Sequence, residues 1–233
     1  VTCNERISAV RIWNVSNRAP IGTLKVGMTG LMNIINLTGT CYGKEGLFCA
    51  FKNGSVGVLN YHQKKLEYLS QPNHSETVFD VVFKPSNKNI VATGAYDGII
   101  KIWNTDGMEC ILNIAKPTQE IQIHTRVFAP FQKNVVYALC WHPGSEDKIV
   151  SVNASGEVLV WNTEKGRLIA DITPGTNSPI HRVDWNPMSP NLIATGSTDC
   201  LVFVLNFDGK SLSVKQKIKL PGVVYGVAWS PHY

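Results

Sequence analysis

Hydrophobic and polar positions along the chain follow a pattern that returns about every 44 residues. The stretches DGIIKIWN at 97–104, SGEVLVWN at 155–162 and DCLVFVLN at 199–206 are three copies of it. In each copy, aliphatic side chains stand one and three residues before a Trp or Leu anchor, and this alternation of period two predicts a β-strand. The anchors, each followed by Asn, are Trp13, Leu59, Trp103, Trp161 and Leu205, and they lie 46, 44, 58 and 44 residues apart.

Two further apolar runs precede each anchor. The nearer run, such as NIVATG or NLIATG, carries a small polar or thiol side chain ten residues before the anchor: Cys3, Cys49, Thr93, Ser151 and Thr195. The earlier run reads VFDVVFKP, VYALCWHP, IHRVDWNP or VYGVAWSP and is marked by Phe83, Trp141, Trp185 and Trp229, with a degraded copy around Leu37. A fourth, weaker run such as RLIADI follows each anchor, and turn-forming residues separate the runs. The repeat is therefore four short antiparallel strands.

A four-stranded sheet of this size cannot bury both of its faces alone, so copies must stack face to face. A ring of such sheets satisfies this requirement, and the chain is expected to be an all-β protein, a β-propeller of four-stranded antiparallel blades. Four complete repeats and partial blades at both ends are predicted, over residues 1–28, 29–72, 73–116, 135–174, 177–220 and 222–233. The chain starts inside a second strand and stops after a first strand. Two arrangements follow: a piece of a longer array, or a ring of five blades closed by its end strands.

These repeats resemble the WD-repeat β-propeller family over essentially all 233 residues. The resemblance implies a buried tetrad of hydrogen-bonded side chains in each blade: a His before the first strand, a Ser or Thr in the second, an Asp in the following turn and a Trp in the third. The third repeat matches at every position, with His74, Thr93, Asp97 and Trp103. Asp97 should accept from the imidazole, whose other nitrogen reaches the Thr93 hydroxyl, and this hydroxyl should accept from the indole N–H.

Other repeats depart from the family pattern. Leu59 and Leu205 replace Trp, Cys3 and Cys49 replace the hydroxyl, and Asn follows each anchor where the family has Asp. These losses put the tetrad in doubt in those blades. They leave the strand pattern intact, because hydrophobic burial sets it.

The spacing of 58 residues contains an insertion at 117–134, between the outer strand of one blade and the inner strand of the next. Its aromatic residues Phe128 and Phe131 flank Pro130. Long loops inside compact repeats are often functional. Two interpretations stay open: the loop packs its own aromatic side chains onto the rim, or it protrudes and binds a partner.

Composition and charge narrow the class of protein. The chain is 44% hydrophobic and 17% charged with a net charge of +5, which is typical of a globular protein, and no apolar run is long enough to span a membrane. The N-terminus does not resemble a signal peptide, and the six cysteines have irregular spacings without a CxxC pair. We therefore expect reduced thiols and a cytoplasmic protein, and the family resemblance implies large cytoplasmic, cytoskeletal or ciliary assemblies.

The densest run of positive charge is KSLSVKQKIK, where Lys215, Lys217 and Lys219 alternate with other residues on one face of a predicted strand. Such lysines are typical of a solvated outer strand that resists edge-to-edge pairing. A patch for nucleic acid or an acidic partner is the alternative, although no aromatic residues are interleaved for base stacking.

The sequence carries no catalytic signature: it lacks GxSxG, a phosphate loop, HExxH and a dinucleotide-binding GxGxxG that opens a helix. The histidines are not spaced as metal ligands on one strand face. Asp97 and Asp199 recur at one repeat position, which favours structural roles. No catalytic residue, metal or cofactor is therefore expected.

Candidate binding residues come from the family resemblance, which implies that three positions line the top rim where peptides dock. One lies four residues before the marker of each first strand, the second lies two residues earlier, and the third precedes the turn Asp. Aromatic residues with a polar tip are frequent in interface hot spots. Here these positions hold Phe79, Tyr137, His181 and Tyr225, with Tyr96 before the turn and Asn33 in the degraded copy. The alternative is that the side chains only fill the mouth of the channel.

The predicted function is a non-catalytic scaffold that binds partner proteins or peptides through this rim, together with the remaining blades of a parent chain. No small-molecule substrate is expected. An RNA-binding propeller and a propeller hydrolase are the alternatives; the modest charge does not favour the first, and the apolar and aromatic rim does not favour the second.

Overall fold

The computed structural model of the chain describes residues 2–4, 9–14, 16–25, 31–41, 44–60, 63, 65–69, 73–116 and 134–230. Every regular element among these residues is a strand. The described part contains no helix that is long and apolar enough to cross a membrane. The predicted all-β class is confirmed.

The described strands form five antiparallel sheets, which we number in chain order. Sheet 1 holds β1 (Thr2–Asn4), β2 (Ala9–Asn14) and β3 (Ala19–Lys25). Sheet 2 holds β4 (Leu31–Cys41), β5 (Lys44–Phe51), β6 (Val56–Asn60) and β7 (Lys65–Tyr68). Sheet 3 holds β8 (Val78–Lys84), β9 (Asn87–Ala95), β10 (Ile99–Asn104) and β11 (Glu109–Ala115). Sheet 4 holds β12 (Val136–Trp141), β13 (Lys148–Asn153), β14 (Val158–Asn162) and β15 (Arg167–Ile172), and sheet 5 holds β16 (Ile180–Trp185), β17 (Leu192–Ser197), β18 (Leu201–Phe207) and β19 (Leu212–Lys219).

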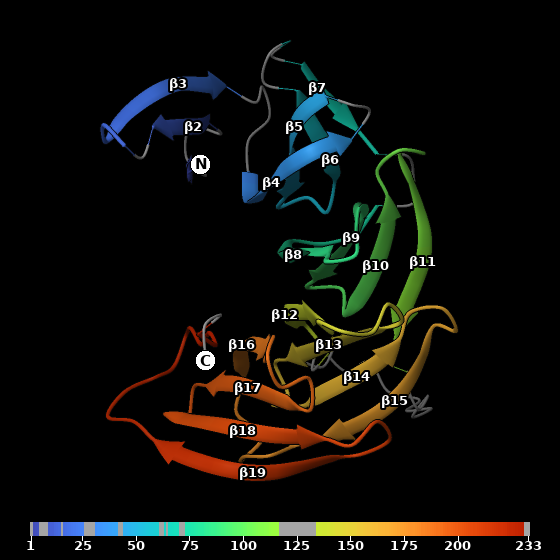
Figure 1. Ribbon diagram of the computed structural model, residues 1–233, viewed down its shortest axis with the longest axis vertical. Coiled ribbons are helices and arrows are strands. Elements are labelled where there is room, and N and C mark those ends of the chain that lie inside the picture. The colour runs from blue at the N-terminus through green and yellow to red at the C-terminus, as the bar shows by residue number, and fades with distance from the viewer. Residues whose placement is uncertain are drawn as a thin grey trace, which may run out of the picture.

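The sheets follow one another around an arc, as blades of a propeller do (Figure 1). In sheets 2–5 the first strand lies nearest the middle of the arc and the fourth strand lies outermost. The inner strands β4, β8, β12 and β16 contact one another in chain order. The start of every inner strand is therefore brought close to the start of the next, although they are far apart in the sequence.

The hydrophobic core lies between the sheets. Three clusters of buried side chains are each shared by two consecutive sheets: Phe48 with Trp103, Ile102 with Trp141, and Val160 with Trp185 are examples from the three. Full burial of one such aliphatic side chain contributes about 1.5–3 kcal/mol to folding. Each sheet thus covers the apolar face of the next, as the sequence pattern predicts.

Two glycines allow adjacent sheets to approach closely. A Cβ on Gly94 of β9 would lie 2.5 Å from Cγ1 of Val136, and one on Gly196 of β17 would lie 2.6 Å from Cγ1 of Val224. Both contacts are shorter than real Cβ contacts. The two glycines therefore stand where the first segment of the following repeat packs on the preceding sheet.

One predicted strand is not formed. The segment VVYGVAWSP was expected to be an inner strand, but residues 222–230 have no strand pairing. An inner strand forms its ladder with the second strand of its own sheet, and this segment has no such partner among the described residues. It still packs on sheet 5, where the Val224 N–H donates to Ser197 O over 3.1 Å. At the other end of the described chain, β1 pairs with β2 alone.

Candidate functional site

The tetrad of sheet 3 fixes the turn that carries the first rim residue. The Trp103 Nε1–H donates to Thr93 Oγ1 over 2.8 Å, and Thr93 Oγ1 lies 2.7 Å from His74 Nε2. His74 Nδ1 lies 3.0 Å from an Asp97 oxygen. All donors are satisfied when the Thr93 hydroxyl donates to Nε2 and the Nδ1–H donates to Asp97. The structure thus places the four side chains in the order expected from the sequence, and Tyr96 precedes Asp97 directly.

Electrostatics supports the same arrangement. Burial favours the protonated form of Asp97, but the hydrogen bond from His74 and the backbone N–H groups of Ile99 and Ser75 outweigh it and lower the pKa of this carboxyl. The carboxylate is therefore ionised at neutral pH. It holds the β9–β10 turn against the segment that leads into β8.

The other described sheets keep only parts of the tetrad. In sheet 4 the Trp161 indole donates to Ser151 Oγ over 2.8 Å, so Trp161 keeps the indole–hydroxyl bond that Trp103 makes with Thr93. In sheet 5 Leu205 replaces the indole, and the buried Thr195 hydroxyl and one Asp199 oxygen have no hydrogen-bond partner in the structure. The doubt raised by the sequence for sheet 5 is thus explained by the loss of the indole.

A β-bulge sits near the start of each inner strand of sheets 3–5. The register of β8 with β9 skips Phe79, that of β12 with β13 skips Tyr137, and that of β16 with β17 skips His181. A bulged residue leaves the ladder, and the bulge re-aims its side chain. The three bulged residues are three of the predicted rim residues. The bulge itself could not be predicted from the alternation of polar and apolar positions, because it breaks that alternation.

The predicted rim residues form one continuous line of ring contacts, which we call the ring file: Tyr96, Phe79, Tyr137, His181 and Tyr225. The successive ring centroids lie 6.3, 5.4, 4.8 and 5.1 Å apart. The residues come from three sheets and from the segment that follows sheet 5. Tyr225 is 70% exposed and Tyr96 is 37% exposed, while the three bulged residues are half-buried.

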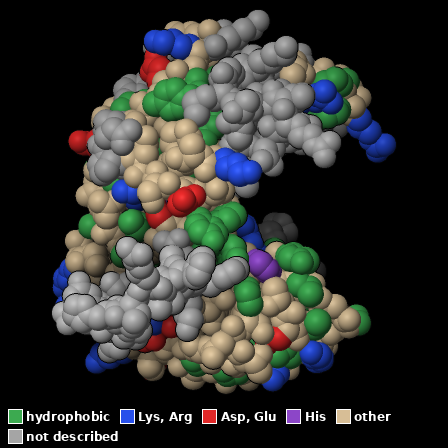
Figure 2. Space-filling model, turned by 180° about the vertical axis from the view of Figure 1, so that it is seen from behind, with side chains coloured by type: hydrophobic (Ala, Val, Ile, Leu, Met, Phe, Trp, Pro, Cys, Tyr) green, Lys and Arg blue, Asp and Glu red, His purple; other side chains and the backbone are tan. Residues whose placement is uncertain are grey.

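The ring file lies beside the turns of the same edge. The residue before each turn donates its N–H to the residue just before the inner strand: Tyr96 to Thr77, Ala154 to Val135 and Thr198 to Pro179, over 2.8, 3.1 and 3.0 Å. This bond recurs in three sheets, so the turns and the strand starts form one rim. Figure 2 shows hydrophobic side chains and a histidine gathered at the inner, concave edge of the molecule.

Burial disfavours the charged form of His181 and lowers its pKa, so the imidazole is neutral at pH 7. A neutral ring between Tyr137 and Tyr225 offers one N–H donor and one acceptor. The whole ring file therefore carries no formal charge at neutral pH. Its chemistry is that of apolar ring surface with polar tips.

Carboxyl and thiol side chains of the inner strands form a second group that the sequence reasoning missed. The Leu139 N–H donates to Asp80 over 2.8 Å and the Trp229 N–H donates to Asp184 over 2.7 Å, while the Trp185 N–H approaches Cys140 Sγ at 3.3 Å. Each of these acceptors belongs to the preceding inner strand. They satisfy N–H groups on strand edges that no ladder covers. A charged residue inside an otherwise apolar first strand, as in VFDVVF and IHRVDW, is the sequence signal that could have found them.

These inner-strand side chains have structural rather than reactive roles. Burial raises the pKa of Cys140 to about 12, so this thiol is protonated and inert at neutral pH. Burial also raises the pKa of Asp80, against the attraction of Arg182, whose Nη1 lies 3.5 Å from Asp80 Oδ1. Within the described residues no group of three or more His, Cys, Asp and Glu side chains could hold a metal ion.

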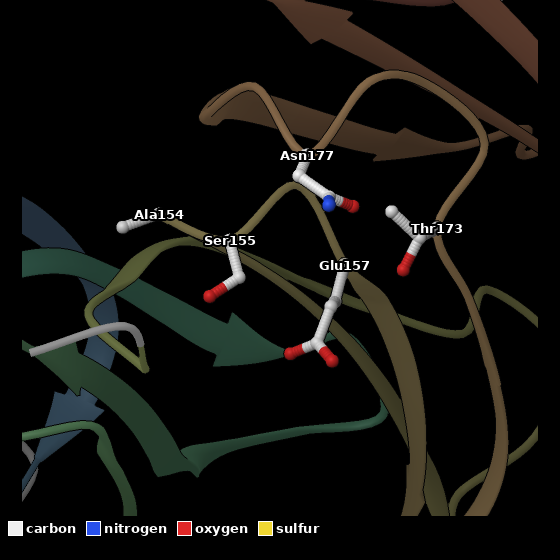
Figure 3. Close-up of a pocket in the computed structure, with 5 residues that line it drawn as sticks. All are labelled: Ala154, Ser155, Glu157, Thr173 and Asn177. Atoms are coloured by element: carbon white, nitrogen blue, oxygen red, sulfur yellow. The ribbon is translucent and has the colours of Figure 1, made fainter.

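A polar pocket of about 390 Å³ lies on the same rim, between the β13–β14 turn and the β15–β16 loop. Its lining residues are Ala154, Ser155, Glu157, Thr173 and Asn177 (Figure 3). The Glu157 carboxylate is occupied by Lys116 at 2.5 Å and by Asn153 at 2.7 Å. Burial raises the pKa of Glu157, but these two hydrogen bonds outweigh it and lower the pKa. No charge is left in this pocket to attract an ion.

Three predicted residues are not among the described side chains. Phe128 and Phe131 of the insertion lie outside the described residues, and so does the side chain of Asn33. The insertion joins Lys116, next to β11, to Asn134, next to β12, so both ends of the loop lie on the rim that carries the ring file.

The family comparison supports the class indicated by the fold. The family model described as "WD domain, G-beta repeat" matches residues 66–104, which contain the complete tetrad. The match covers sheet 3 and the end of sheet 2. Together with the WD-repeat relatives below, it supports the WD40 repeat family for this chain.

Several curated proteins are similar to the chain. They include the protein transport protein SEC31 of Kluyveromyces lactis (24% identical, covering 76% of this chain and 14% of that protein) and the histone acetyltransferase type B subunit 2 of Candida glabrata (25%, 70% and 34%). The peroxisomal targeting signal 2 receptor of Mus musculus is 24% identical, over 61% of this chain and 40% of that protein. The chain thus spans much less than two thirds of these relatives.

Among solved structures, a chain in the crystal structure of the mitotic checkpoint complex superimposes with a TM-score of 0.74 at 16% identity, over 97% of this chain and 63% of that one. This likeness shows the propeller fold. The WD40 repeat, the relatives and the fold together point to a general role as a protein-interaction scaffold.

Proposed function

We propose that this chain is a non-catalytic platform that binds partner proteins or peptides through the ring file. One observation carries the proposal: five rings from three sheets and the following segment meet in a single line on one rim. Large rings with few rotatable bonds lose little entropy on binding, and they are enriched in interface hot spots. The hydrophobic core forms between the stacked sheets without the ring-file residues. Filling the core is therefore not the main role of these rings.

The names of the relatives agree with this function. One is a receptor for a targeting signal, one is a subunit of a histone acetyltransferase, and the structural neighbour is part of a checkpoint complex. We extend to this chain only the common element, which is the binding of another polypeptide. The insertion at 117–134 is proposed as a second contact, because its ends lie on the same rim. The stretches VRIWNVS and HSETVFDVVFKP further suggest a likeness to WD repeat-containing protein 17, whose remaining blades would then be partners as well.

A peptide-display selection on the purified chain tests the proposal. Peptides enriched on the wild type are synthesised, and their dissociation constants are measured for Tyr137→Ala and Tyr225→Ala. Loss of a hot-spot ring costs 2 kcal/mol or more, so the dissociation constant should rise about 30-fold.

Met188→Ala is the matched control. Met188 is 62% exposed and follows the end of β16, on the opposite edge from the rim. Its substitution should leave the dissociation constants unchanged. Peptides that bind the rim variants as tightly as the wild type would disprove a role of the ring file.

A further inference from the structure

The polar tips of the ring file have no partner inside the described protein. No hydrogen bond from a described residue reaches the hydroxyls of Tyr96, Tyr137 and Tyr225 or the ring nitrogens of His181. Each phenol is a donor and an acceptor, and each tip accompanies an apolar ring. A ligand on this rim therefore meets three hydroxyl donors in a row beside aromatic surface.

Charge does not select the ligand. The cation–π contacts in the described part of the chain involve Trp13, Trp141 and Phe203, none of which belongs to the ring file. Two charged residues next to ring residues in the sequence are already paired: Asp97, after Tyr96, with His74, and Arg182, after His181, with Asp80. The rings themselves offer no formal charge to a strongly basic or acidic ligand.

Addition of a peptide strand to the inner strands is also disfavoured. Strand addition needs free backbone N–H and C=O groups at a sheet edge. At this edge the N–H groups of Leu139, Trp185 and Trp229 are occupied by side chains of the preceding inner strand. The ligand must therefore bind through side-chain rings and hydroxyls rather than through a ladder.

The spacing of the rings fits a polyproline II helix. Consecutive centroids are 4.8 to 6.3 Å apart, so every second ring is at most about 12 Å away, and about 10 Å at the His181 end. A polyproline II helix repeats every three residues, about 9.3 Å, and one of its ridges can therefore meet every second ring. Its backbone makes no internal hydrogen bonds, and proline has no N–H. It offers carbonyl acceptors only, which is what a row of tyrosine hydroxyl donors requires.

We propose that the ring file binds a proline-rich segment in the polyproline II conformation, with proline rings packed on the exposed surface of the aromatic rings and carbonyl oxygens accepting from the tyrosine hydroxyls. This inference rests on the proposed function and names the chemistry of the partner. Aromatic-lined grooves bind proline-rich segments in the same way in other folds.

Fluorescence anisotropy with two labelled peptides tests the inference. One peptide consists of repeated Pro-Pro-Leu units, and the other has every proline replaced by alanine. On the wild-type chain the first peptide should bind at least about tenfold more tightly, because the polyproline conformation is formed in advance. Equal affinity for both peptides, or binding of neither, would overturn the inference.

Tyr225→Phe isolates the hydroxyl. Tyr225 is 70% exposed, so this change cannot disturb folding through a buried contact. Loss of one hydrogen bond should weaken the proline-rich peptide about threefold to tenfold, and Met188→Ala should have no effect. An unchanged affinity of Tyr225→Phe together with Tyr137→Phe would refute hydroxyl recognition. A second result separates the two proposals. If displayed peptides without proline lose affinity on the ring variants, and the proline-rich peptide does not bind, the proposed function stands and this inference fails.

Discussion

Replacement of Thr93 by Val tests how the tetrad stabilises sheet 3. Val has nearly the same shape as Thr but lacks the hydroxyl. Thr93 is fully buried, and its hydroxyl accepts from the Trp103 indole at 2.8 Å and lies 2.7 Å from His74 Nε2. The substitution leaves the indole N–H and the imidazole nitrogen without partners in the interior.

The magnitude follows from those two groups. A buried polar group left without its hydrogen bond costs about 1–3 kcal/mol. Two such groups should lower the free energy of unfolding by about 3 kcal/mol after partial relaxation. With a urea m-value of about 2 kcal/mol/M, the midpoint of unfolding should fall by about 1.5 M.

Thr195→Val is the matched control within the same chain. Thr195 occupies the same repeat position in sheet 5 and is equally buried, but its hydroxyl has no hydrogen-bond partner in the structure. Removing an unpaired buried hydroxyl should be neutral or stabilise the fold by about 1 kcal/mol. The same substitution therefore should have opposite effects in two copies of one repeat.

Urea unfolding followed by tryptophan fluorescence and circular dichroism gives both midpoints, and agreement of the two probes checks the two-state assumption. Equal shifts for the two variants would refute the reasoning, because they would show that the hydroxyl acts through local strand propensity and not through its partners. A larger loss at Thr195 would refute it as well.

Four further outcomes are expected. Gly94→Ala should lower the free energy of unfolding by about 1–3 kcal/mol, measured by urea unfolding, because the added methyl group would lie 2.5 Å from Val136. Burial acts to raise the pKa of the Asp97 carboxyl in the folded state, but the hydrogen bond with His74 outweighs burial and lowers it. The ionised carboxyl therefore stabilises the fold fully above about pH 4, and this stabilisation should disappear as the pH falls below that value. Asp97→Asn should flatten the pH dependence of the melting temperature in that range. Burial lowers the pKa of His181, so the stability of the fold should also fall as the pH drops below about 6.5. His181→Gln should remove this loss of stability, and an unchanged dependence of the melting temperature on pH would contradict the prediction. Cys140, with a pKa of about 12, should resist iodoacetamide at pH 8 in the folded chain and react on unfolding, as mass spectrometry of the modified peptides would show.

The sequence predicted which residues form the candidate site, but it predicted less well how they are arranged in space. The tetrad residues and the ring residues were found because the family resemblance implies their positions, which lie at fixed places in the repeat. The bulges at Phe79, Tyr137 and His181 were not predictable, since one extra residue in a strand leaves no periodic signal. The charges of the inner strands were missed for a related reason: Asp80 and Asp184 bind N–H groups of the next repeat, 59 and 45 residues away.

The sequence by itself determined the strands, their order within each sheet and the need for sheets to stack, because burial of alternating side chains is a local consequence of their spacing. Only the tertiary structure decided that five rings from separate repeats meet in one line, and that a free strand edge is capped by the neighbouring repeat. Both depend on how far each sheet is rotated and bulged relative to the next. That relation is set by packing between sheets, as at Gly94 and Val136, and no single repeat encodes it.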